Sequence, residues 1–60
     1  MSTSSIIWRH ELDGELQRIW QMRLALRKDA FLAKQEREDI DEGLQALIDT
    51  LIDTKAKISL

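Results

Sequence analysis

The sequence predicts an all-α protein, a two-helix antiparallel hairpin that assembles with a second copy as a four-helix bundle. The 60 residues contain no proline, and the only glycines, Gly14 and Gly43, each lie within a run of good helix formers. Apolar residues recur three and four positions apart in both halves of the chain. β-branched residues never alternate with polar ones over the length of a strand, so we expect no strand.

The first helix is expected from about residue 5 to about residue 28. Its main apolar arc, at helical spacing, contains Trp8, Leu12, Leu16, Ile19, Leu26 and Ala30. A flank beside this arc carries Trp20, Leu24 and Phe31. The hydroxyl groups of Thr3, Ser4 and Ser5 are candidate N-caps, because such groups accept hydrogen bonds from the first free backbone N–H groups of a helix.

The second helix is expected from about residue 34 to about residue 57. Acidic residues at 36, 38 and 39 suit a helix N-terminus, and Lys55 and Lys57 suit the C-terminus. The apolar arc of this helix contains Ile40, Leu44, Leu47, Ile48, Leu51, Ile52 and Ile58. Because the tetrad Leu-Ile-Asp-Thr occurs twice over 47–54, this arc is wide, as in a helix that contacts two neighbours.

The connection at residues 29–33 lacks the residues that usually mark a turn, since no Gly, Pro, Asn or Ser occurs there. A spacing of four and three also continues without a break from Leu12 to Ile58, which makes one long coiled-coil helix an alternative. On that long seam Arg23 and Arg37 would be poor packing residues, and Phe31 would stay in water. The hairpin is therefore the preferred prediction.

A chain of this length is close to the lower limit for an independent hydrophobic core, and two helices in contact along one line bury little apolar surface. We therefore predict a homo-oligomer, a symmetric dimer in the first place, because dimers have the commonest symmetry. Large apolar side chains dominate the energy of such interfaces. The expected anchors are Trp8, Trp20, Leu24, Phe31, Leu47, Ile48, Leu51 and Ile52.

Arg23 lies at the centre of the apolar arc of the first helix, where an uncompensated charge would be costly. The favoured interpretation is a polar core, an ion pair with a carboxylate of a neighbouring helix. The alternative is an anion or ligand site in which Arg23 and Arg27 lie beside the aromatic rings of Trp20 and Phe31.

Several classes of chemistry are not expected. The absence of cysteine excludes a disulfide framework, a thiolate zinc site and a cysteine nucleophile, and it suits a reducing, cytoplasmic location. The motifs of hydrolases, phosphate loops and dinucleotide sites do not occur, so we expect no enzyme, no catalytic residue and no cofactor. His10 and Asp13 alone are a weak metal signal. No segment approaches the ~20 apolar residues of a membrane span, and we expect no membrane partner.

Charge differs between the two halves. Residues 1–34 hold six basic and four acidic residues, and residues 35–60 hold three basic and seven acidic ones. This split suits antiparallel packing, in one chain or between two.

From the remaining apolar and acidic surface we expect a non-enzymatic protein-interaction module, a small self-associating regulator or adaptor with a protein partner. The alternative function is a hairpin dimer that binds nucleic acid through the basic residues of its first helix, Arg9, Arg18, Arg23, Arg27 and Lys28. An overall charge of −2 weakens the electrostatic attraction that this alternative requires.

Overall fold

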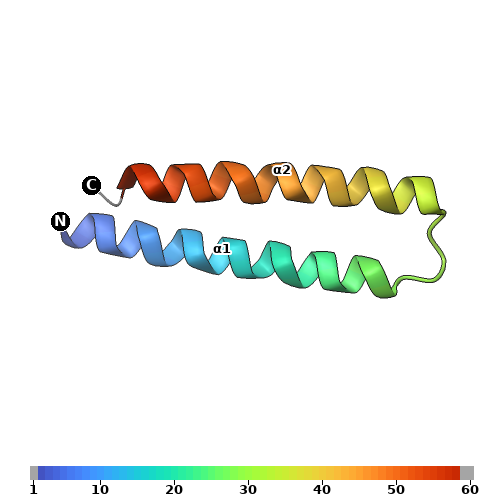
Figure 1. Ribbon diagram of the computed structural model, residues 1–60. Helices are drawn as coiled ribbons and strands as arrows, with labels where there is room; N and C mark the ends of the chain where they lie inside the picture. Colours follow the sequence, from blue (N-terminus) through green and yellow to red (C-terminus); the bar gives the residue numbers. More distant parts are fainter. Residues whose placement is uncertain (1, 59–60) are drawn as a thin grey trace.

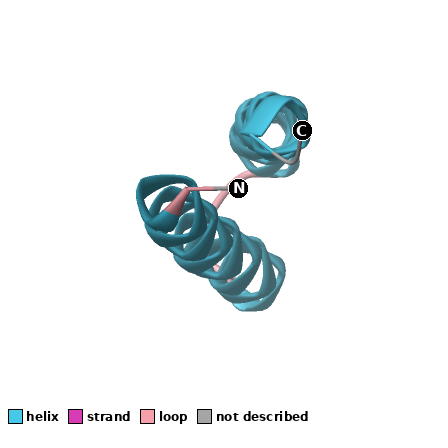
Figure 2. Ribbon diagram, turned by 90° about the vertical axis from the view of Figure 1, so that its left-hand side faces the viewer, coloured by secondary structure: helices cyan, strands magenta, loops and turns pink. Residues whose placement is uncertain are grey.

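The protein is an antiparallel helical hairpin in a computed structural model that describes residues 2–58. Helix α1 (Thr3–Lys28) and helix α2 (Lys34–Ile58) are joined by a turn at residues 29–33. The helices lie side by side, with the start of α1 beside the end of α2 and the turn at the opposite end (Figure 1). Seen along the hairpin, α1 is inclined relative to α2 (Figure 2). The hairpin prediction is confirmed, the single long helix is wrong, and residues 2–58 contain no strand.

Helix α1 begins with a serine cap one position earlier than predicted. The Oγ of Ser2 accepts a hydrogen bond from the backbone N–H of Ser5 at 3.1 Å, so Ser2 is the N-cap. Thr3, Ser4 and Ser5, the predicted caps, form the first turn of the helix instead. A cap satisfies one of the backbone N–H groups that have no partner at a helix start.

The turn is closed by side chains rather than by glycine or proline. The Asp29 carboxylate accepts a hydrogen bond from the backbone N–H of Phe31 at 2.9 Å. Arg37 of α2 reaches back with Nη2 and donates to the backbone carbonyls of Asp29, at 2.5 Å, and Leu32, at 3.4 Å. Because no residue of the turn adopts a positive φ, the turn does not require glycine.

The core is a single line of contact between the two helices. Its buried apolar side chains are Ile19, Leu26, Leu44 and Ile48, and Leu16, Leu32 and Leu51 pack against them. Most shielded residues of each helix recur three and four positions apart, and we call these the seam positions. They are Ser5, Arg9, Leu12, Leu16, Ile19, Arg23 and Leu26 of α1, and Arg37, Asp41, Leu44, Ile48, Leu51, Lys55 and Ile58 of α2.

The wide apolar arc predicted for the second helix is divided by this packing. Leu44 and Ile48 are buried, whereas Ile40, Leu47 and Ile52 remain about half exposed or more. Two helices in contact along one line cover only one narrow stripe of each, so the other aliphatic residues of the arc stay at the surface.

The hairpin has two opposite faces beside the seam. An antiparallel pair of helices has an approximate twofold axis perpendicular to the plane of the pair. A residue that follows a seam position on α1 therefore lies on the same side of the hairpin as a residue that follows a seam position on α2. Residues that follow seam positions form the groove face: Ile6, Asp13, Gln17, Trp20, Leu24, Arg27, Glu38, Glu42, Gln45, Asp49 and Ile52. Residues that precede them form the back face: Trp8, Glu11, Glu15, Arg18, Met22, Ala25, Glu36, Ile40, Gly43, Leu47, Thr50, Thr54 and Lys57.

Candidate functional site

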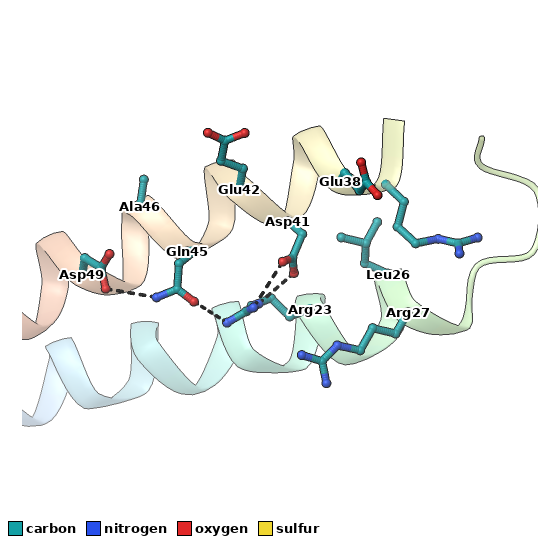
Figure 3. A pocket seen from close by; sticks show the side chains of 10 residues that line it. Arg23, Leu26, Arg27, Glu38, Asp41, Glu42, Gln45, Ala46 and Asp49 are labelled. Atoms are coloured by element: carbon teal, nitrogen blue, oxygen red, sulfur yellow. Dashed lines mark hydrogen bonds and ion pairs between the residues drawn. The ribbon is translucent and has the colours of Figure 1, made fainter. Parts of the chain in front are cut away.

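Arg23 is the one charged residue among the buried side chains of residues 2–58, and it is held by α2. Its Nε donates to Asp41 Oδ1 at 2.9 Å and its Nη2 donates to Asp41 Oδ2 at 3.2 Å. Its Nη1 donates to Gln45 Oε1 at 2.7 Å. All three nitrogens of the guanidinium therefore donate to α2 (Figure 3). This is the ion pair with a neighbouring helix that the sequence predicted as the favoured interpretation.

Groups around this pair strengthen it. The guanidinium carbon of Arg23 lies 4.9 Å from the centre of the Trp20 ring, a cation–π distance. The hydrogen bonds from Arg23 hold the pKa of Asp41 below its ordinary value. Gln45 also forms a hydrogen bond with Asp49, in which its Nε2 donates to Asp49 Oδ1 at 3.0 Å. A connected polar cluster thus runs from the seam to the surface of the groove face.

The groove beside this cluster is open and carries both signs of charge. It has a volume of about 660 Å³, and Arg23, Leu26, Arg27, Arg37, Glu38, Asp41, Glu42, Gln45, Ala46 and Asp49 line it. Glu42 points away from the Arg23–Asp41 pair (Figure 3). Since four of the lining residues are acidic and Arg23 is already engaged, the groove is poorly suited to an anion.

A second ion pair joins the helices near the open end of the hairpin. Lys55 Nζ lies 2.5 Å from Asp13 Oδ1, and this contact lowers the pKa of Asp13. Lys55 is a seam residue and Asp13 belongs to the groove face. With Arg23 and Asp41 near the turn, one interhelical ion pair therefore lies toward each end of the hairpin and fixes how the helices are aligned.

The predicted interface anchors are distributed over four places, namely the back face, the groove face, the turn and the seam. Trp8 and Leu47 lie exposed on the back face, and Trp20, Leu24 and Ile52 lie exposed on the groove face. Phe31 is fully exposed in the turn. Ile48 is only 1% exposed and Leu51 is half-buried, so both already pack within one chain.

The predicted anchors did not include two apolar residues of the back face, and the partners of Arg23 were not identified. Met22 and Ile40 are about half exposed on the back face, which also carries Trp8 and Leu47. Asp41 has seam spacing relative to Leu44 and Ile48, but Ile40 has the same kind of spacing relative to Leu44 and Leu47, so spacing alone could not identify Asp41.

Metal and membrane sites are not found in the part of the chain that the structure describes. Residues 2–58 contain no group of three or more His, Cys, Asp or Glu side chains that would hold a metal ion. No helix within the same range is long and apolar enough to cross a membrane.

Comparison with known proteins gives no relative from which a function could be transferred. Neither the protein-family models, nor the curated proteins, nor the solved structures include a match to this chain. The surfaces that the hairpin leaves exposed therefore carry the information about its function.

Proposed function

We propose that this chain is a non-enzymatic protein-interaction module, a small helical regulator or adaptor that acts as a self-associated dimer. The proposal rests on one observation, the amount of surface that the hairpin leaves uncovered. The groove face and the back face have separate roles in it.

The hairpin exposes more surface than a compact protein of its mass. Its accessible surface is 4771 Å² for a mass of 7.0 kDa. A compact monomer of that mass exposes about 4,000 Å². The difference, roughly 700 Å², is close to the ~800 Å² that each partner buries in a protein interface of standard size. A second copy would cover the surplus.

The shape of the molecule explains this surplus. Its radius of gyration is 14.3 Å, and its extents are 46 × 15 × 9 Å. A compact domain of this length has a radius of gyration of about 10 Å. The exposed large apolar residues include both tryptophans, at 60% for Trp8 and 46% for Trp20. Aromatic residues are enriched at protein interfaces, where they supply much of the binding energy.

The groove face supports the adaptor role. It carries the exposed side chains of Trp20, Leu24 and Ile52 next to the acidic residues Glu38 and Asp49. A protein segment with apolar and basic side chains would be complementary to this combination. This face remains available when two copies associate through the back face.

The nucleic-acid alternative gains no support from the arrangement of the basic residues. Arg23 is buried against Asp41, and Arg18 lies 3.2 Å from Glu15. Phosphate binding needs a concentration of positive charge on one surface. We therefore propose no second function.

The proposal is tested by melting the protein over a wide range of concentrations, followed by far-UV circular dichroism. If dimer formation stabilises the fold, the melting temperature rises with protein concentration by mass action. A melting temperature independent of concentration, with full helical signal, would show a self-sufficient monomer and overturn the proposal.

A further inference from the structure

The back face of α2 carries a second stripe with the spacing of a coiled coil. It consists of Glu36, Ile40, Gly43, Leu47, Thr50, Thr54 and Lys57. These residues recur at alternate intervals of four and three, as do the seam residues. One acidic residue begins the stripe, one basic residue ends it, and every residue between them is uncharged.

This stripe is open to a neighbour. Ile40 is 44% exposed and Leu47 is 52% exposed. A Cβ atom built on Gly43 would meet no atom within 4 Å, so the backbone can be approached closely there. The equivalent stripe of the groove face carries four polar residues, Glu38, Glu42, Gln45 and Asp49, before its first apolar residue, Ile52. The back face is therefore the side of α2 that suits helix packing.

The stripe is also symmetric about Leu47. Ile40 and Thr54 each lie seven residues from Leu47, and Gly43 and Thr50 flank it at four and three residues. Two such stripes placed antiparallel about a twofold axis at Leu47 bring each residue between Glu36 and Lys57 opposite an apolar or small one. We infer that two copies dock through their back faces, with α2 packed antiparallel against α2 of the second copy and Leu47 at the twofold axis.

Charge complementarity selects this orientation. In the antiparallel arrangement Glu36 of each copy lies opposite Lys57 of the other, at both ends of the interface. Lys57 also lies 3.1 Å from Asp53 of its own helix, but both side chains are more than two-thirds exposed. An exposed pair of this kind is weak, so Lys57 can turn to Glu36 of the second copy at little cost.

The twofold axis at Leu47 also brings opposite charges of the two α1 helices together. Counted from the Arg23–Asp41 pair, Leu47 of α2 lies level with Gln17 of α1, because six residues separate each from the pair. An axis at that height passes between Glu15 and Arg18 of the back face. Glu15 of one copy then lies opposite Arg18 of the other, so one axis satisfies the charges of both helices.

Single cysteines test this docking, because the native chain has none. A Leu47→Cys variant places the two thiols together at the axis and is expected to form a disulfide-linked dimer in mild oxidant. Ile52→Cys is the matched control, since Ile52 lies on the groove face of the same helix with 53% exposure, against 52% for Leu47. A mixture of Ile40→Cys and Thr54→Cys variants should link to each other, whereas Ile40→Cys alone should not, because about 20 Å of helix would separate its thiols.

Charge exchange gives an independent measurement. Glu36→Lys alone and Lys57→Glu alone are each expected to raise the dimer dissociation constant about threefold to tenfold. The reason is that each variant places like charges opposite each other at both ends of the dimer interface. The double variant restores opposite charges and should recover the native constant. Glu38→Lys, on the groove face, should leave the dissociation constant close to that of the native chain.

The outcomes separate this inference from the proposed function on which it rests. Disulfide formation by Ile52→Cys and not by Leu47→Cys, or no linkage by Leu47→Cys in a chain that sediments as a dimer, would overturn the back-face docking and leave self-association intact. The same holds if the charge-exchanged double variant is no better than the singles. A chain that sediments as a monomer would overturn both.

Discussion

The guanidinium of Arg23 and the carboxylate of Asp41 form a two-point contact across the hairpin, between residues 18 positions apart in the chain. Two parallel N–H···O bonds fix both the distance and the orientation of the two groups. A shift of α2 by one residue would carry Asp41 off the seam and leave Arg23 buried without its carboxylate. This pair therefore selects the alignment of the helices.

Replacing Arg23 by methionine should lower the melting temperature of the hairpin. The variant keeps an aliphatic chain in the seam but loses the hydrogen bonds to Asp41 and Gln45. Arg27→Met is the control, because Arg27 is exposed on the groove face. A double variant, Arg23→Met with Asp41→Leu, should be less destabilised than the sum of the two single changes, because the residues interact directly. Thermal melts that show equal losses for Arg23→Met and Arg27→Met would contradict this role.

Stability should fall in acid because of the two interhelical carboxylates. The pKa of Asp41 and the pKa of Asp13 both lie below the ordinary value of 3.8, through hydrogen bonds with Arg23 and Lys55. A carboxyl whose pKa is lowered by folding stabilises the protein fully above its unfolded pKa and loses that contribution as the pH falls through the lowered pKa. Helical signal should therefore be insensitive to pH above about pH 5 and decline below about pH 4.

The acid profile has its own control variant. A chain with both Asp13→Asn and Asp41→Asn lacks the two titrating groups, so its unfolding free energy should change less between neutral and acid pH. Chemical denaturation at a series of pH values measures the difference. Parallel profiles for the variant and the native chain would show that these carboxylates do not carry the acid dependence.

Arg37 should be required for a well-formed turn. Its Nη2 donates to the carbonyls of Asp29 and Leu32, which would otherwise lack these side-chain donors. Arg37→Ala is expected to cost about 1 to 3 kcal/mol of unfolding free energy, as for hydrogen bonds made by a charged donor. Lys34→Ala, at the exposed start of α2, is the control. Denaturant unfolding measures both, and similar small effects would argue against closure of the turn by Arg37.

Two neighbouring residues of α2 should behave in opposite ways. Ile48 is buried in the seam, and Ile48→Ala should destabilise the hairpin by about 2 to 5 kcal/mol through lost contacts and a cavity. Leu47 is 52% exposed, so Leu47→Ala should leave the packing within one hairpin unchanged and weaken association instead. Melting at low and at high protein concentration distinguishes the effects. Equal stability of the two variants at every concentration would contradict the assignment of Ile48 to the seam.

The positions of the helices and the turn could be read from the sequence, but the choice of core residues on α2 could not. Helix formers and apolar spacing located the two helices within two residues of their observed ends. In the doubled tetrad, however, Leu47 and Ile48 are equally apolar, and spacing alone does not say which one faces α1. The contact between Arg23 and Asp41 decides it, and such a pair between distant residues leaves no periodic signal.

The side-chain contacts that close the turn could not be predicted from the sequence either. Its place followed from the poor seam residues and from Phe31, but its closure by Arg37 did not, because sequence rules for turns consider local residues. The donor comes from the first turns of the next helix, and its target is a backbone carbonyl. Neither feature is visible in composition or spacing.

Sedimentation equilibrium of the native chain at micromolar concentration measures its self-association. Self-association predicts a mass of twice the 7.0 kDa of one chain, with dissociation and loss of helical signal on further dilution. A mass of 7.0 kDa at every concentration, with the helices fully formed, would contradict it.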